Sequence, residues 1–439
     1  MKKFLGNAAV LFIFWVIVYW ITVKIAVRFV TIYPINGIKP LFFSFWFFSI
    51  LYGKYWSLKS TKTLATWLKY SLVFFGFFTS VYYAYSVVKR SIILFNELNG
   101  QNYRGWNPNP HKPDDTLGLA PKRGFKANHT FAIGPNIAMY FNKQGFRVPV
   151  KDSAQVVDKD TLGVMFLGCS YTYGDACLAE ETFAFKVGRQ LGVNTVNAGV
   201  CSYGLSQMYL LSQKLVPQYK PKYTVIQFSP WLVERATSWG APAANNFLPS
   251  PYFYDKDDSI ALQLPIERTS VFNINREELT KKYSGKYFSF LFGFALSYLF
   301  SEDWKVIKYK TPVWLGGPPN PSHEKEKVMK IAYSNMIREI LKNGSRPVIL
   351  CLGDSAYSEK AFAMFKNKNV IVVNADKALK KGIRIETGDA FTRYSKTYCH
   401  WRKPNPKASD SVMVDSHPNP YAHSIIANEI VNAIKSNQK

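Results

Sequence analysis

Hydrophobic and polar positions alternate in two different ways along this chain. Before about residue 95, long apolar runs carry no charge and are separated by short basic loops. After about residue 114, apolar runs of strand length alternate with stretches of helical periodicity. The change predicts a transmembrane region over residues 1–95, an Asn-, Gly- and Pro-rich linker over residues 96–113, and a globular domain over residues 114–439.

Three apolar runs give the first region its membrane character. Leu5–Val23 is uncharged and, at ~1.5 Å per residue, long enough to cross a hydrocarbon core of about 30 Å. Tyr70–Val88 is also uncharged, and the shorter run Pro40–Gly53 is almost wholly apolar. We therefore predict three transmembrane helices in a multi-pass protein of the cytoplasmic (inner) membrane.

The basic residues around these runs predict a topology. Four lysines between the second and third runs favour a cytoplasmic loop there, which places the globular domain outside the cytoplasm. The lysines and arginine of the first loop, together with Lys89 and Arg90, favour the opposite orientation. If the second run does not span, the globular domain lies in the cytoplasm.

The globular domain has the pattern of an α/β protein. Strands alternating with helices predict a mostly parallel sheet covered on both faces. Residues of about 239–321 interrupt this alternation of strands and helices and are interpreted as an insertion. The one apolar run of the insertion, Tyr287–Phe300, predicts a buried or membrane-facing helix. The predicted strands are 164–167, 193–197, 223–228, 347–352 and 369–373, and the predicted helices are 180–191, 206–215, 324–342 and 424–435.

The stretch Gly168–Gly174 (GCSYTYG) follows a buried strand and precedes a predicted helix. A serine on such a turn occupies a nucleophile's position, because the turn lifts the hydroxyl of Ser170 out of the sheet. Backbone N–H groups at a helix start can then stabilise an oxyanion. A Gly/Ser loop without chemical meaning is the alternative.

A second stretch, Val414–Asn419 (VDSHPN), supplies partners for the serine. Asp415 can hold the imidazole of His417 so that its other ring nitrogen faces the hydroxyl. The hypothesis makes Ser170 the nucleophile, His417 the general base and acid, and Asp415 the orienting carboxylate. A capped turn before the last helix is the alternative, and His423 is a second candidate base whose position in a helical first turn suits packing.

Three segments together resemble the SGNH/GDSL hydrolases. Phe166–Gly174 (FLGCSYTYG) is similar to the first block of that family, Val196–Gly204 (VNAGVCSYG) to the second, and Asp415–Asn419 (DSHPN) to the last. Upstream, Gly145–Arg147 is similar to a lead-in segment of membrane-anchored members.

The resemblance implies a flavodoxin-like three-layer α/β/α sandwich over about residues 114–439. It also implies ester hydrolysis or acyl transfer without a metal or cofactor. The implied oxyanion hole uses the backbone N–H of Ser170 and a second-block N–H at Ser202, with Gly199 as the fallback position.

Several positions depart from the family pattern. Cys169 stands where an aspartate is usual, Ser202 stands where a glycine is usual, and no asparagine follows the strand 223–228. Removing one oxyanion donor costs about 3 kcal/mol of transition-state stabilisation. The triplet Gly353-Asp354-Ser355 matches the family name literally, but it comes late in the chain and is predicted to occupy a later strand end.

The charge of the chain favours an anionic neighbour. The net charge is +26, and residues 1–100 hold eleven Lys and Arg against one acid. Membrane headgroups or an acidic polymer fit this balance. No zinc-finger spacing or RNA-binding aromatic motif is present, so nucleic acid is not expected as a partner. The five cysteines form no CxxC pair and predict no disulfide framework.

These observations predict a membrane-anchored serine esterase that removes O-acyl groups, chiefly acetyl, from an envelope glycan or a related molecule. One alternative is a subunit of an O-acyltransferase that works with a membrane acyltransferase partner. Another is a non-catalytic, SGNH-like protein that binds or assembles envelope components.

Overall fold

The structure, a computed structural model, describes two compact units of the chain. One unit is Met1–Asn99 with Arg276–Pro318, and the other is Gly100–Asn275 with Pro319–Lys439. The described residues are 80, 83–96, 99, 105–131, 133–134, 136–152, 156–158, 160–243, 246–268, 274, 276–353, 355–365, 369–381, 383, 390–405 and 407–438.

The predicted transmembrane runs lie largely outside these residues. Leu5–Val23 and Pro40–Gly53 fall outside altogether, and only the last part of Tyr70–Val88 is described, as the start of a helix that continues to residue 96. Within the described ranges, no helix combines the length and the apolar character needed to cross a bilayer.

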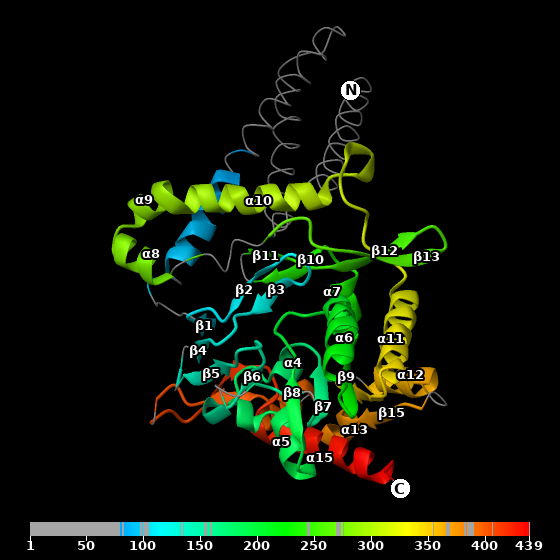
Figure 1. The fold of residues 1–439 in the computed structure, drawn as a ribbon. Coiled ribbons are helices and arrows are strands. Elements are labelled where there is room, and N and C mark those ends of the chain that lie inside the picture. Colours follow the sequence, from blue (N-terminus) through cyan, green and yellow to red (C-terminus); the bar gives the residue numbers. More distant parts are fainter. Residues whose placement is uncertain are drawn as a thin grey trace, which may run out of the picture. The chain divides into compact units, whose positions relative to one another are not determined.

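A five-stranded parallel sheet forms the centre of the second unit (Figure 1). The predicted α/β domain with a parallel sheet is therefore confirmed. Numbered along the chain, the strand order is 2-1-3-4-5, as in flavodoxin-like doubly wound sheets. In spatial order the strands are β15 (Ile371–Asn374), β14 (Arg346–Cys351), β9 (Tyr223–Phe228), β7 (Leu162–Leu167) and β8 (Asn194–Asn197).

Helices cover both faces of this sheet because its strands are apolar on both sides. In β7, Met165 and Leu167 point into one hydrophobic cluster, whereas Val164 and Phe166 point into another. The first cluster is completed by α6 (Leu205–Tyr219), α7 (Pro230–Ala236), α11 (Lys325–Lys342) and α12 (Ser355–Phe365). The second is completed by α5 (Phe183–Leu191), α13 (Ala375–Lys381) and α15 (Pro420–Ser436).

Short antiparallel strands that the sequence pattern did not predict surround the central sheet. They are too short to show a clear alternation of apolar and polar residues. A four-stranded sheet contains β1 (Gly105–Asn107), β4 (Lys126–Thr130), β5 (Ile137–Phe141) and β6 (Arg147–Val148). Two hairpins pair β2 (His111–Asp114) with β3 (Gly118–Pro121), and β16 (His400–Arg402) with β17 (Val412–Asp415).

The predicted insertion divides between the two units. Its first part contributes two hairpins to the second unit: β10 (Gly240–Ala243) with β11 (Asn246–Pro249), and β12 (Tyr252–Lys256) with β13 (Ser259–Gln263). Its later part belongs to the first unit and is helical. There α8 (Arg276–Tyr283) is followed by α9 (Tyr287–Phe290), a π-helical turn (Leu291–Ala295) and α10 (Leu296–Lys310). The predicted helix over Tyr287–Phe300 is therefore present and extends ten residues further.

Candidate active site

Ser170 lies at the carboxyl edge of the central sheet. Strand β7 ends at Leu167, and Ser170 begins the one-turn helix α4 (Ser170–Tyr173). Strands β7 and β9 are neighbours at the position where the strand order reverses. Ligands of open α/β sheets bind in the crevice at this position, so Ser170 stands where a reacting group is expected.

A buried side chain of the neighbouring strand holds the turn that carries Ser170. The Oε1 atom of Gln227 in β9 accepts hydrogen bonds from the backbone N of Cys169 at 3.1 Å and from Thr172 Oγ1 at 2.8 Å. This approach requires a glycine at position 168, because a Cβ there would lie 2.0 Å from Thr172 Oγ1. Gly168 therefore serves the packing of the turn.

Arg147 binds the other end of the same helix. Its guanidinium is buried and donates to the carbonyl of Tyr173 at 2.7 Å, to that of Gly174 at 2.5 Å, and to that of Cys177. A cation suits the carbonyl end of a helix. Sequence reasoning noted Gly145–Arg147 only as a lead-in segment, and the structure gives its arginine a positioning role.

Asp415 and His417 form a hydrogen-bonded pair. The two atoms that meet, His417 Nδ1 and Asp415 Oδ1, lie 2.7 Å apart, and the same carboxylate oxygen accepts the backbone N–H of His417 at 2.8 Å. The following turn is fixed because Asn419 caps α15 by accepting the N–H of Ala422 at 3.0 Å. With Nδ1 engaged by Asp415, Nε2 is the nitrogen left for a serine.

The structure brings this pair to the serine turn. The ring of Tyr171, the neighbour of Ser170, meets the ring of His417 edge-on, with 5.6 Å between centroids. The Ser170 hydroxyl donates to Cys169 Sγ at 3.9 Å, and among the described residues no hydrogen bond joins Ser170 to His417. Catalytic hydrogen bonds are often long in ligand-free enzymes and tighten with substrate.

The surroundings of His417 favour its protonated form. Burial lowers the pKa of His417, but the hydrogen bond to Asp415 and the negative charges of Asp175 and Asp415 outweigh burial and raise it to about 9. Burial raises the pKa of Asp415, and the bond to His417 more than offsets this, so that the pKa lies below its usual value. At neutral pH the pair is therefore an imidazolium and a carboxylate.

Asp175 belongs to a second His–Asp pair that the sequence analysis missed. Its Oδ1 lies 2.9 Å from Nδ1 of His129 in β4, and both side chains are buried. Its backbone N–H donates to the carbonyl of Ser170 at 3.1 Å.

The residue after Asp175, Ala176, has a φ of 62°, a left-handed conformation that costs a non-glycine residue about 1–2 kcal/mol. Burial raises the pKa of Asp175, but His129, His417 and Arg147 together lower it, so the carboxylate is ionised.

The two backbone N–H groups of the second block that were expected in the oxyanion hole differ in whether they already have a hydrogen-bond acceptor. The N–H of Gly199 donates to Asn197 Oδ1 at 3.0 Å, and a Cβ at Gly199 would lie 2.6 Å from the backbone N of Tyr173. Gly199 therefore permits close packing against α4. Ser202 has a φ of 67°, the conformation that favours the glycine of the family pattern, and its N–H has no acceptor within the described part of the chain.

No asparagine follows β9 to serve as an oxyanion donor, and the side chains that stand there support the turn of Ser170. Ser229 Oγ accepts from Gln227 Nε2 at 2.9 Å, and the indole N–H of Trp231 donates to Cys169 Sγ at 3.3 Å. The rings of Trp231 and Tyr171 pack with 5.0 Å between centroids. These contacts depend on side chains that meet only in the folded domain, and no local sequence signal marks them.

The remaining candidates from the sequence have structural roles. His423 is fully buried, and its Nδ1 accepts the N–H of Phe183 at 3.1 Å, while burial lowers its pKa well below the ordinary value. Gly353 follows β14 and Ser355 begins α12, so these two residues of the triplet lie at a later strand end as predicted. Over the described residues, no group of three or more His, Cys, Asp or Glu side chains could hold a metal ion.

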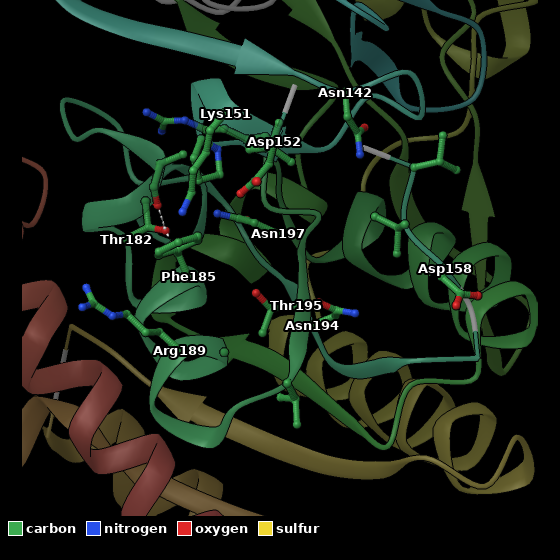
Figure 2. Close-up of a pocket in the computed structure, with 18 of the residues that line it drawn as sticks. Asn142, Lys151, Asp152, Asp158, Thr182, Phe185, Arg189, Asn194, Thr195 and Asn197 are labelled. Carbon is green, nitrogen blue, oxygen red and sulfur yellow. Dashed lines mark hydrogen bonds between the residues drawn. The ribbon is translucent and has the colours of Figure 1, made fainter. Parts of the chain in front are cut away.

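A cavity of about 510 Å³ lies beside the edge strand β8 and does not include Ser170 in its lining (Figure 2). Its polar side chains are largely committed to the fold. Asn197 donates to the carbonyl of Thr172 at 2.8 Å, and Thr182 caps α5 by accepting the N–H of Phe185 at 3.4 Å. The cavity therefore lies behind α4 and is not the predicted reaction site.

No family model and no curated protein matches the chain. Several solved structures do resemble it, at low identity. One is a G-D-S-L family protein from Desulfitobacterium hafniense (TM-score 0.31, 12% identity, 62% of this chain and 99% of that chain covered). A second is a GDSL-like lipase from Bacteroides thetaiotaomicron (TM-score 0.29, 12% identity, 65% of this chain and 92% of that chain covered). A third is a mutant acetylxylan esterase from Geobacillus stearothermophilus (TM-score 0.31, 10% identity, 62% of this chain and 94% of that chain covered). A likeness of this degree says nothing of activity, which depends on the side chains described above.

The left-handed backbone at Ser202 generates a stability prediction. Ser202→Gly removes the strain of a Cβ and adds chain entropy to the unfolded state, so we expect a net gain of roughly 0.5–1 kcal/mol in the free energy of unfolding. Urea unfolding would measure it. Lys220→Gly, at another left-handed position (φ 42°), is the matched control and should gain similarly. A loss of stability in Ser202→Gly alone would mean that its side chain is engaged.

The two carboxylates near His417 generate a pH prediction. Because the pKa of His417 is raised from 6.5 to about 9, its stabilising contribution is complete below pH 6.5 and is lost as the pH rises through about 9. Histidine NMR titration should show a lower pKa in Asp415→Asn and, by a smaller shift, in Asp175→Asn. Asp410→Asn, at an exposed carboxylate, is the control. An unchanged His417 titration in Asp415→Asn would contradict the assignment.

Proposed function

We propose that the chain is a serine hydrolase of acyl esters with Ser170 as nucleophile. The observation that carries the proposal is the convergence of an Asp415-oriented imidazole on the serine turn at the switch point of the sheet. The order of the three residues in the chain and the block resemblance to SGNH/GDSL hydrolases agree with it.

In this proposal the deprotonated fraction of His417 takes the hydroxyl proton as Ser170 Oγ attacks the ester carbonyl. The backbone N–H groups of Ser170 and Ser202 stabilise the oxyanion that forms. His417 then returns the proton to the leaving alcohol, which releases it and leaves an acyl-serine. A water molecule, activated by the same imidazole, attacks the acyl group, and the serine is regenerated.

The substrate class is a further part of the proposal. The ring of Tyr171, the residue after Ser170, packs against that of Trp231 with 5.0 Å between centroids, and aromatic side chains commonly line ligand sites. The basic character of the chain suits an acidic polymer. We propose O-acyl, chiefly acetyl, groups on an envelope glycan as the substrate, with the chain anchored in the cytoplasmic membrane by its N-terminal region. An O-acyltransferase acting with a membrane partner uses the same acyl-serine, with a sugar hydroxyl in place of water.

One observation favours a non-catalytic binding or assembly role instead. The Ser170 hydroxyl is directed to Cys169 Sγ rather than to His417 among the described contacts. The usual asparagine donor is also absent after β9. A direct chemical test separates the two functions.

We expect wild-type protein to react with a fluorophosphonate probe and to hydrolyse p-nitrophenyl acetate. In Ser170→Ala, labelling should disappear and turnover should fall by about 10³-fold or more, because no hydroxyl remains to be acylated. Gel fluorescence and release of nitrophenol measure the two effects.

Two controls sharpen this test. Ser355→Ala, in the triplet that matches the family name, should label as wild type does, and Cys169→Ala should keep a labelled Ser170. Wild-type protein that never labels, or Ser170→Ala that labels equally, supports the non-catalytic alternative.

The proposed location has its own test. A reporter fused after Lys439 that is active only outside the cytoplasm should be active in cells, and a reporter that is active only inside should be silent. The reverse pattern would place the globular domain in the cytoplasm.

A further inference from the structure

The helical part of the first unit has an exposed aromatic face. Five large side chains on it are strongly exposed, although they belong to an ordered helix and the turn that follows it. They are Phe288 (73%), Phe292 (73%), Phe300 (51%), Trp304 (60%) and Trp314 (81%). We call these five residues the aromatic face. Isolated exposed apolar residues are ordinary, but a contiguous set marks an interaction surface.

A π-helical turn aligns the members of this face. Residues four apart in an α-helix drift by about 40° per repeat, so Phe288, Phe292, Phe300 and Trp304 would wind around a regular helix. The π-helical turn Leu291–Ala295 takes more residues per revolution and offsets this drift. The four side chains on the helix are therefore gathered on one side, and Trp314 follows in the turn Val313–Leu315.

The opposite side of the same helix is already packed on protein. Phe290, Leu299 and Val306 are buried, and the ring of Phe290 lies 5.3 Å from that of Phe95. Asp303 accepts two hydrogen bonds from Arg90, at 2.9 and 2.7 Å. The inner side therefore holds the helix in place. Phe300 of the aromatic face shares in this packing, with 5.8 Å between its ring and that of Tyr83, and still leaves half of its surface exposed.

The charges nearest to the start of the face are positive, whereas the exposed acids Glu277 and Glu278 lie one turn earlier in α8. Lys281, Lys282 and Lys286 are exposed just before α9. The two acids of α10 are neutralised, because Glu302 pairs with Lys305 at 2.9 Å and Asp303 pairs with Arg90. Aromatic rings with flanking lysines are the composition of helices that lie in the headgroup region of a bilayer.

We propose that the aromatic face lies in the interface of a membrane that contains anionic phospholipid. Phe288, Phe292 and Phe300 enter the boundary between headgroups and acyl chains. Trp304 and Trp314 lie at headgroup level, and the lysines contact lipid phosphates. This surface is independent of the proposed hydrolase, and it requires no transmembrane helix.

Site-specific quenching tests the proposal on the full chain. The native cysteines are all buried, so a single introduced cysteine can carry a fluorophore selectively. Phe292→Cys and Trp314→Cys report on the face, and Ser301→Cys, exposed on the same helix but off the face, is the matched control. The labelled chains are reconstituted in vesicles of phosphatidylcholine with phosphatidylglycerol, which contain lipids spin-labelled near the headgroup.

We expect roughly twofold stronger quenching at positions 292 and 314 than at 301, because an interfacial helix buries its apolar face ~5–10 Å deep. Equal quenching at all three positions would overturn the proposal. Strong quenching by aqueous iodide at 292 would place the face in water, and protection from both quenchers would place it against protein, which also rejects the proposal. Equal results in pure phosphatidylcholine would reject the anionic component. Hydrolysis of p-nitrophenyl acetate by the same variants reports on Ser170 and separates a failure here from a failure of the proposed function.

Discussion

Gln227 and Arg147 hold the turn that carries Ser170, and every feature of the candidate site depends on where they place it. One comes from the central parallel sheet and the other from the small antiparallel sheet. Hydrogen bonds to charged groups contribute about 1.5–3 kcal/mol each, and a buried donor left without its acceptor is costly. The position of the turn is therefore set by two sheets of the domain together.

Two carboxylates around one imidazole set the chemical character of the site. Asp415 fixes the ring's orientation through Nδ1, whereas Asp175 acts through its charge alone. Together they make His417 a strong base that is mostly protonated at neutral pH. A base of this kind is most effective in alkaline solution or after a bound substrate has changed its surroundings. His129 helps to keep Asp175 ionised, so a strand of the small sheet contributes to the electrostatics of the candidate site.

The central sheet was largely predictable from the sequence, but the support of the site was not. Strand β9 occupies the residues predicted for it, 223–228, because a buried parallel strand is a mainly apolar run bounded by polar residues, here Lys222 and Ser229. Ser170 and His417 were also predictable, since each stands in a local motif of small and turn-forming residues. His129, Asp175 and Trp231 were not, because their roles come from contacts across the folded domain. The division of the insertion between two units likewise depends on tertiary packing.

The two halves of the candidate site come from distant parts of the chain, and this separation has a kinetic consequence. The turn of Ser170 follows the first strand of the central sheet, whereas Asp415 and His417 precede the helix that completes one of its faces. Contacts of such high contact order form late, after the loop-closure entropy of the intervening chain has been overcome. A nascent or partly folded chain thus displays Ser170 without His417, and the candidate site is assembled only with the last steps of folding.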